Sequence, residues 1–72
     1  MESKSCSMNR NDIVFNLKEG LKAEYRAVDV YKELLPKLTD KTDQNTIELV
    51  IEDEKKHIRF LEEMIITVNE NL

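Results

Sequence analysis

The stretch LLPKLTDKTD at residues 34–43 decides the fold. Pro36 removes a backbone donor and disfavours helical geometry at Leu35, so we expect a helix to end near there or to finish in a distorted last turn. Residues 39–43 offer several helix caps and little that is apolar, which predicts a turn. Two helices joined by so short a connection pack antiparallel. The expected fold is all-α, an antiparallel two-helix hairpin.

On both sides of this turn, apolar residues recur at intervals of three and four, as they do on one face of a helix. Asn11 or Asp12 is the expected N-cap of the first helix. Gly20 weakens that helix by about 1 kcal/mol relative to alanine, and the second helix should fray over residues 69–72. The apolar positions are Ile13, Val14, Leu17, Leu21, Ala27, Val28, Tyr31, Leu34 and Leu35 in the first helix, and Ile47, Val50, Ile51, Ile58, Leu61, Met64, Ile65 and Val68 in the second.

Composition limits the class of protein. The 72 residues make one small domain, near the size at which a single core is only marginally stable. A net charge of −4 argues against a nucleic-acid partner, and a lone cysteine, Cys6, excludes an internal disulfide framework. No apolar run is long enough to cross a membrane, and residues 1–10 are polar where a signal peptide would be apolar. We expect a cytoplasmic protein, with residues 1–10 as a mobile arm and residues 11–72 as one helical-hairpin domain.

An isolated hairpin exposes a long apolar strip, because it cannot bury both faces of its helices. A second copy packed by two-fold symmetry is the simplest remedy. The expected assembly is therefore a homodimer in which two hairpins complete a four-helix bundle, or a larger ring of such dimers.

Three ionisable residues interrupt the apolar stripes. Glu24 lies on the first helix, and Glu54 and His57 lie on the second, where an unpaired buried charge would cost several kcal/mol. With Thr39 as the centre of the turn, Glu24 and Glu54 are equally far from it and should be level with each other. His57 follows Glu54 by one helical turn. The hairpin should therefore bring Glu24 to face Glu54 and His57.

Doubling by two-fold symmetry gives four carboxylates and two imidazoles, the ligand set of di-iron carboxylate bundles. Two Fe(II) ions would neutralise the four carboxylate charges, although Mn or Zn also suits such a site. Glu54 could bridge two metal ions, and Tyr31, two turns after Glu24, could hydrogen-bond a ligand. The remaining acidic residues of the second helix are expected on a solvated face: Glu52, Asp53, Glu62 and Glu63.

Two segments resemble the rubrerythrin and ferritin-like superfamily. IEDEKKH at residues 51–57 resembles its second-helix motif, and AVDVY at residues 27–31 resembles a segment of the encapsulated-ferritin branch, whose subunit is also one two-helix hairpin. The resemblance covers roughly residues 17–64. It implies a ferroxidase that binds two Fe(II) per dimer between subunits and oxidises them with dioxygen or peroxide. Glu24, Glu54 and His57 match the metal ligands of the family.

The sequence departs from that family at several positions. Ala23 and Arg26 stand where the family has acidic residues beside the first glutamate, and Val30 replaces an aromatic residue. An encapsulin shell is a partner of this branch, but we find no docking extension before the chain ends at Leu72. A rubrerythrin-like peroxidase would usually need a four-cysteine iron site, which one cysteine cannot supply.

Two alternatives stay open at the level of the sequence. The second helix could be rotated so that Ile51, Ile58 and Ile65 face the first helix and Glu54 is solvated. The chain could also be a non-catalytic dimeric hairpin, acting as an adaptor or binding a metal ion only for structure. The two functions differ in whether the chain binds iron in pairs and oxidises it.

Overall fold

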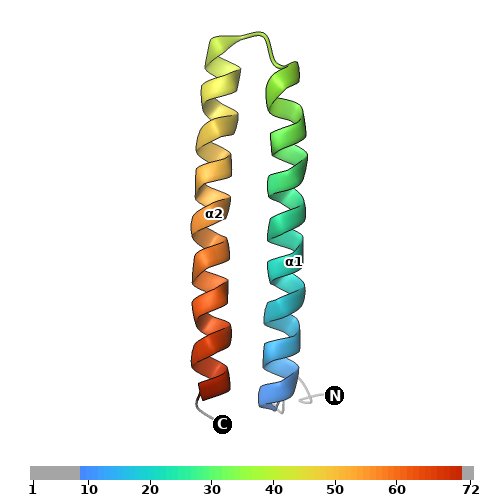
Figure 1. The fold of residues 1–72 in the computed structure, drawn as a ribbon, viewed down its shortest axis with the longest axis vertical. Helices are drawn as coiled ribbons and strands as arrows, with labels where there is room; N and C mark the ends of the chain where they lie inside the picture. The colour runs from blue at the N-terminus through green and yellow to red at the C-terminus, as the bar shows by residue number, and fades with distance from the viewer. Residues whose placement is uncertain (1–8, 71–72) are drawn as a thin grey trace, which may run out of the picture.

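The computed structural model describes residues 9–70, which form an antiparallel hairpin of two long helices (Figure 1). Helix α1 spans Arg10–Leu34 and helix α2 spans Lys41–Glu70, and the short 3-10 helix η2, Leu35–Lys37, lies between them. The predicted all-α hairpin is confirmed. Cys6 and most of the predicted N-terminal arm, together with residues 71–72, lie outside the described residues.

The helix ends are set by short polar contacts. Asn9 caps α1 because its side-chain oxygen accepts a hydrogen bond from the Asp12 backbone N–H at 2.9 Å. The predicted cap at Asn11 or Asp12 is therefore wrong by two or three residues. Pro36 lies in η2, as expected for a distorted last turn. Asp40 Oδ1 accepts from the N–H groups of Thr42, at 2.7 Å, and Asp43, at 3.2 Å, so α2 begins earlier than predicted.

The core of the hairpin is a narrow seam between the two helices. Its buried side chains are Val28 of α1 and Ile51, Ile58 and Ile65 of α2. The three isoleucines are spaced by seven residues, which keeps them on one line of a helix that packs at a shallow angle against another. Four partly buried side chains flank the seam: Leu21, Tyr31, Leu35 and Ile47.

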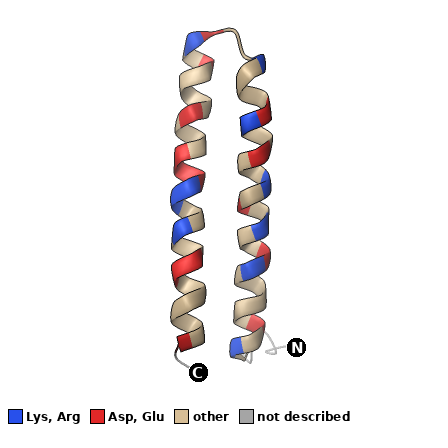
Figure 2. Ribbon diagram, viewed as in Figure 1, with Lys and Arg blue, Asp and Glu red and all other residues tan. Residues whose placement is uncertain are grey.

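Polar contacts also join the helices at the edges of the seam. The Tyr25 hydroxyl donates a hydrogen bond to Glu62 Oε2 at 2.9 Å, and an Arg10 guanidinium nitrogen donates to the Val68 carbonyl at 3.3 Å. Glu62 is exposed as predicted, but its contact with Tyr25 across the hairpin was not foreseen. Charged residues of both signs are distributed along both helices (Figure 2).

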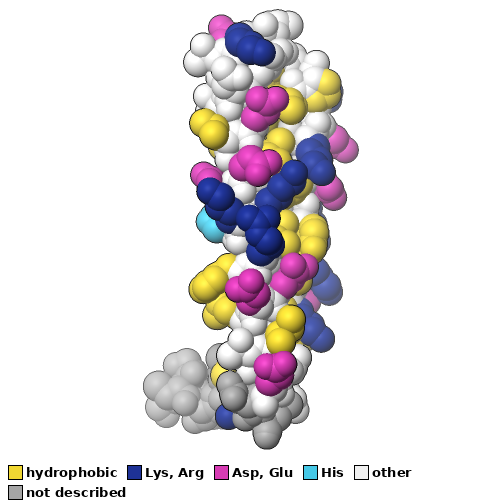
Figure 3. Space-filling view, turned by 60° about the vertical axis from the view of Figure 1, so that its left-hand side comes forward, with side chains coloured by type: hydrophobic (Ala, Val, Ile, Leu, Met, Phe, Trp, Pro, Cys, Tyr) yellow, Lys and Arg dark blue, Asp and Glu magenta, His cyan; other side chains and the backbone are white. Residues whose placement is uncertain are grey.

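Much apolar surface remains uncovered in the single hairpin. In the space-filling view, apolar side chains lie between charged ones over much of the face shown (Figure 3). None of the described helices is both long and apolar enough to span a membrane. The large exposed apolar side chains are Phe15, Tyr25, Val30, Leu34, Leu49, Phe60 and Ile66.

Candidate metal centre

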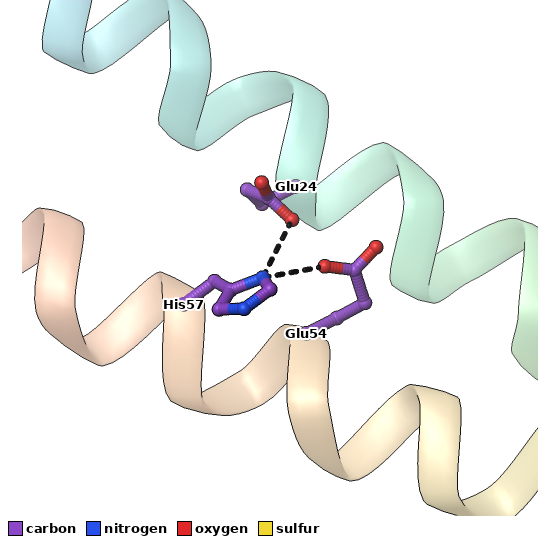
Figure 4. Close-up of side chains that lie close together, drawn as sticks. All are labelled: Glu24, Glu54 and His57. Carbon is purple, nitrogen blue, oxygen red and sulfur yellow. Dashed lines mark hydrogen bonds and ion pairs between the residues drawn. The ribbon is translucent and has the colours of Figure 1, made fainter.

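Glu24, Glu54 and His57 come together near the middle of the hairpin, with Glu24 on α1 and the other two on α2 (Figure 4). His57 Nδ1 lies 3.1 Å from Glu54 Oε1 and 4.0 Å from Glu24 Oε1. One ligand atom from each residue fits within 4.8 Å of the other two. The structure therefore places all three residues predicted from the sequence in one cluster.

The position of the turn explains this meeting. Asp40 starts α2 at Lys41, and η2 ends α1 at Leu34, so both helices leave the turn at nearly the same height. Because each rises by about 1.5 Å per residue, Glu24 and Glu54 become level. His57 then lies one turn further along α2 and closes the cluster by its contact with Glu54.

The cluster lies beside the apolar seam and not within it. Ile51 and Ile58 occupy the line of α2 that faces α1, as in the alternative rotation considered from the sequence. Glu54 and Glu24 retain 19% and 29% of their side-chain exposure, and His57 retains 63%. A single hairpin therefore holds the three groups together but leaves one side of the cluster open.

The two carboxyl groups affect each other's protonation. The pKa of Glu24 is raised above its ordinary value, first by a side-chain hydrogen bond with Glu54, then by partial desolvation and by the Glu54 charge. The same hydrogen bond lowers the pKa of Glu54, with help from His57. Of the two carboxyl groups, Glu24 is therefore the one that ionises at the higher pH.

These donors fit a divalent transition-metal ion. Two carboxylates and one imidazole are ligands that Fe(II), Mn(II) and Zn(II) accept, at about 2.0–2.2 Å for zinc. His57 contacts both carboxylates through Nδ1, the nitrogen that faces the cluster. Three protein ligands leave further coordination positions for water, substrate or another chain. Within residues 9–70, no other group of three such side chains is as close.

Tyr31 does not complete this cluster. Tyr31 is partly buried and packs against the buried cluster of Val28, Ile51 and Ile58. Among the hydrogen bonds of the described chain, none joins Tyr31 to Glu24, Glu54 or His57. The predicted role of Tyr31 beside a metal ligand is not realised within one hairpin.

Comparison with known proteins found no relative of this chain. No protein-family model, curated protein or solved structure matches this chain. The resemblance to ferritin-like proteins stays a prediction from the sequence motifs.

Proposed function

We propose that the chain is the subunit of a ferritin-like di-iron protein that oxidises Fe(II) at a site shared by two copies. The observation that carries this proposal is the cluster of Glu24, Glu54 and His57, whose ligand atoms lie within 4.8 Å of one another on an open face of the hairpin. Two carboxylates and one imidazole are ligand types that bind divalent transition-metal ions.

The open side of the cluster leaves room for ligands from a second copy of the chain. One hairpin supplies three protein ligands, whereas two copies supply four carboxylates and two imidazoles. Four carboxylates balance the charge of two Fe(II) ions, so a filled site between two hairpins is neutral in a region from which water is excluded.

The chain's own residues have distinct roles in this scheme. Glu54, the less exposed carboxylate, is placed to bridge two ions, while Glu24 and His57 each bind one. Iron is the substrate: two Fe(II) lose one electron each to one dioxygen, which takes up two protons and leaves as hydrogen peroxide. A metal ion competes with the proton for the Glu24 carboxylate, so binding strengthens as pH rises through the raised pKa of Glu24.

An anaerobic Fe(II) titration followed by sedimentation tests the proposal. We expect saturation at two iron ions per dimer, and near-ultraviolet Fe(III) absorption that grows when air is admitted. Glu54→Gln should reduce the rate of iron oxidation by about 100-fold or more, because it removes the bridging charge. Glu63→Gln, on the exposed surface of the same helix, is the matched control and should leave the rate unchanged.

The alternative function is a non-catalytic hairpin, for which the 3.1 Å contact between Glu54 and His57 is only a surface ion pair. That contact needs no metal ion to satisfy either group. A stable helical protein that binds no iron stoichiometrically, or that oxidises iron equally fast as Glu54→Gln, would favour this alternative over the ferroxidase.

A further inference from the structure

One row of residues on α1 is not used by the hairpin's own core. Ile13, Gly20, Ala27 and Leu34 are spaced by seven, and none belongs to the buried cluster or to the side chains packed on it. Gly20 and Ala27 lie four residues before and three after Glu24, so the row flanks Glu24 on the same helix face. We call this row the site-face row.

Gly20 has no function inside the hairpin that explains it. A Cβ built at Gly20 meets nothing within 4 Å, so the neighbouring helix does not require a glycine there. The residue nevertheless costs the helix about 1 kcal/mol relative to alanine. Because this side of α1 is open at Gly20, another helix can approach it closely from outside the single hairpin.

The site-face row is symmetric along the chain. Its small residues, Gly20 and Ala27, stand in the centre, and its large ones, Ile13 and Leu34, stand at the ends. Both pairs have the same midpoint, between residues 23 and 24. A surface that pairs with itself about a two-fold axis needs this kind of symmetry, because each residue must match its counterpart in a chain running the other way.

We propose that α1 pairs antiparallel with α1 of a second copy through the site-face row, with Gly20 against the partner's Ala27 and Ile13 against the partner's Leu34. This arrangement rests on the proposed function in one respect, the completion of the metal centre by a second copy. The two-fold axis passes beside Glu24, and therefore also at the level of Glu54. Both copies then present their carboxylates to the same point.

The small residues set the spacing of the carboxylates. With glycine facing alanine, two helices can approach to about 8 Å, the lower end of the usual range of interaxial distances. Side chains spaced by seven residues rotate around a straight helix by about 20° per repeat. A shallow left-handed crossing of the two helices compensates for this rotation and keeps the row in contact. Bulkier residues at positions 20 and 27 would separate the two Glu24 side chains.

The area of this face is sufficient for a stable dimer. The row on α1 extends over about 33 Å, with α2 packed beside it along that length, and two helices side by side are about 20 Å wide, which gives about 660 Å² per copy. The two copies together would bury about 1,300 Å², within the range of specific interfaces. A second copy of this chain therefore fits the face in size as well as in symmetry.

Cysteine cross-linking distinguishes this arrangement from others. In a Cys6→Ser background, Gly20→Cys and Ala27→Cys are made separately, and one of them carries a mass tag. Positions 20 and 27 of two copies lie side by side in the proposed pairing, within the reach of about 7 Å between Cα atoms that a disulfide allows. Position 20 of one copy lies about 10.5 Å along the helix axis from position 20 of the other copy, which is too far for a disulfide.

We expect disulfide-linked dimers in the mixture of the two variants and few in either variant alone. Glu19→Cys mixed with Ala27→Cys is the control and should not cross-link, because residue 19 lies on a different, exposed face. Equally strong disulfide linkage in each single variant and in the mixture would overturn the pairing. A mixture without disulfide-linked dimers would also overturn it, whether the protein sediments as a dimer or as a monomer.

A second pair of variants tests the need for a small residue. Gly20→Leu should weaken dimerisation roughly tenfold or more, with helicity retained because the space beside Gly20 is open in the single hairpin. Glu19→Leu adds the same side chain elsewhere and should leave dimerisation unchanged. Equal dimerisation by both variants contradicts the pairing.

The outcomes separate this pairing from the proposed function. Cross-linking between positions 20 and 27 without iron oxidation by the wild-type chain removes only the ferroxidase. Iron oxidation at two ions per dimer without that cross-link removes only the pairing.

Discussion

Glu24 and Glu54 carry the same side chain, but their pKa values move in opposite directions because the hydrogen bond between them raises the pKa of Glu24 and lowers that of Glu54. Glu54 also has the His57 imidazole at 3.1 Å, whereas Glu24 is 4.0 Å from it. As pH rises, Glu54 therefore loses its proton before Glu24 does. For a Glu whose folded-state pKa is raised, the stabilising contribution is present below the ordinary value of 4.5 and is lost as pH rises through the raised value. For Glu54 the contribution is present above 4.5 and is lost as pH falls through the lowered value.

The variant Glu54→Gln should lower the pKa of Glu24 in the metal-free protein. It removes the negative charge that opposes ionisation of Glu24, and its amide can donate a hydrogen bond to the Glu24 carboxylate. Carboxyl chemical shifts followed by NMR during a pH titration measure this change. Glu63→Gln serves as the control, and a Glu24 that titrates at the same pH in wild type and Glu54→Gln would contradict the explanation.

At the level of single residues, the sequence predicted which ligands meet but not how exposed they are. Glu24 and Glu54 are level because the rise per residue is the same in both helices, so counting from Thr39 suffices. The rotation of α2 depends on which of two parallel stripes packs better. Branched Ile51 and Ile58 fill the seam more completely than a line containing Glu54 and His57 does, and spacing alone cannot decide this.

At the scale of the helices, the boundaries depend on which side chain reaches a free backbone N–H. The predicted caps, Asn11 and Asp12, and the observed cap, Asn9, are all suitable N-cap residues, so residue type alone does not choose among them. The structure uses Asn9, which adds a turn to the helix. The end of α1 was predictable because Pro36 leaves few alternatives.

Asp40 should stabilise the start of α2. Its carboxylate accepts from two backbone N–H groups, those of Thr42 and Asp43, which have no partner within the helix. Asp40→Ala should reduce the free energy of unfolding by about 1 kcal/mol, and Asp40→Asn should retain most of it. Urea denaturation at one fixed protein concentration measures both. Thr39→Ala is the neighbouring control, and an Asp40→Ala variant as stable as this control would show that the cap contributes nothing.

The whole molecule buries few side chains for its length. Within residues 9–70 only Val28, Ile51, Ile58 and Ile65 are buried, and no polar or charged residue joins them. A core this small supplies little of the free energy needed to order more than sixty residues. The exposed apolar side chains leave surface for a second hairpin to cover, and the open side of the Glu24, Glu54 and His57 cluster favours the site face for that contact.

The stability of the metal-free protein should therefore depend on its concentration. If folding and dimerisation are coupled, a hundredfold dilution lowers the stability of the dimer by about 2.8 kcal/mol, which corresponds to a fall of roughly 6–11 °C in the melting temperature. Circular dichroism melts at several concentrations, with sedimentation at the same concentrations, measure this. Gly20→Leu should melt at a lower temperature than wild type at high concentration and show a weaker dependence on dilution. A wild-type melting temperature that is constant over this range, in a protein that sediments as a monomer, would mean that the narrow seam is sufficient by itself.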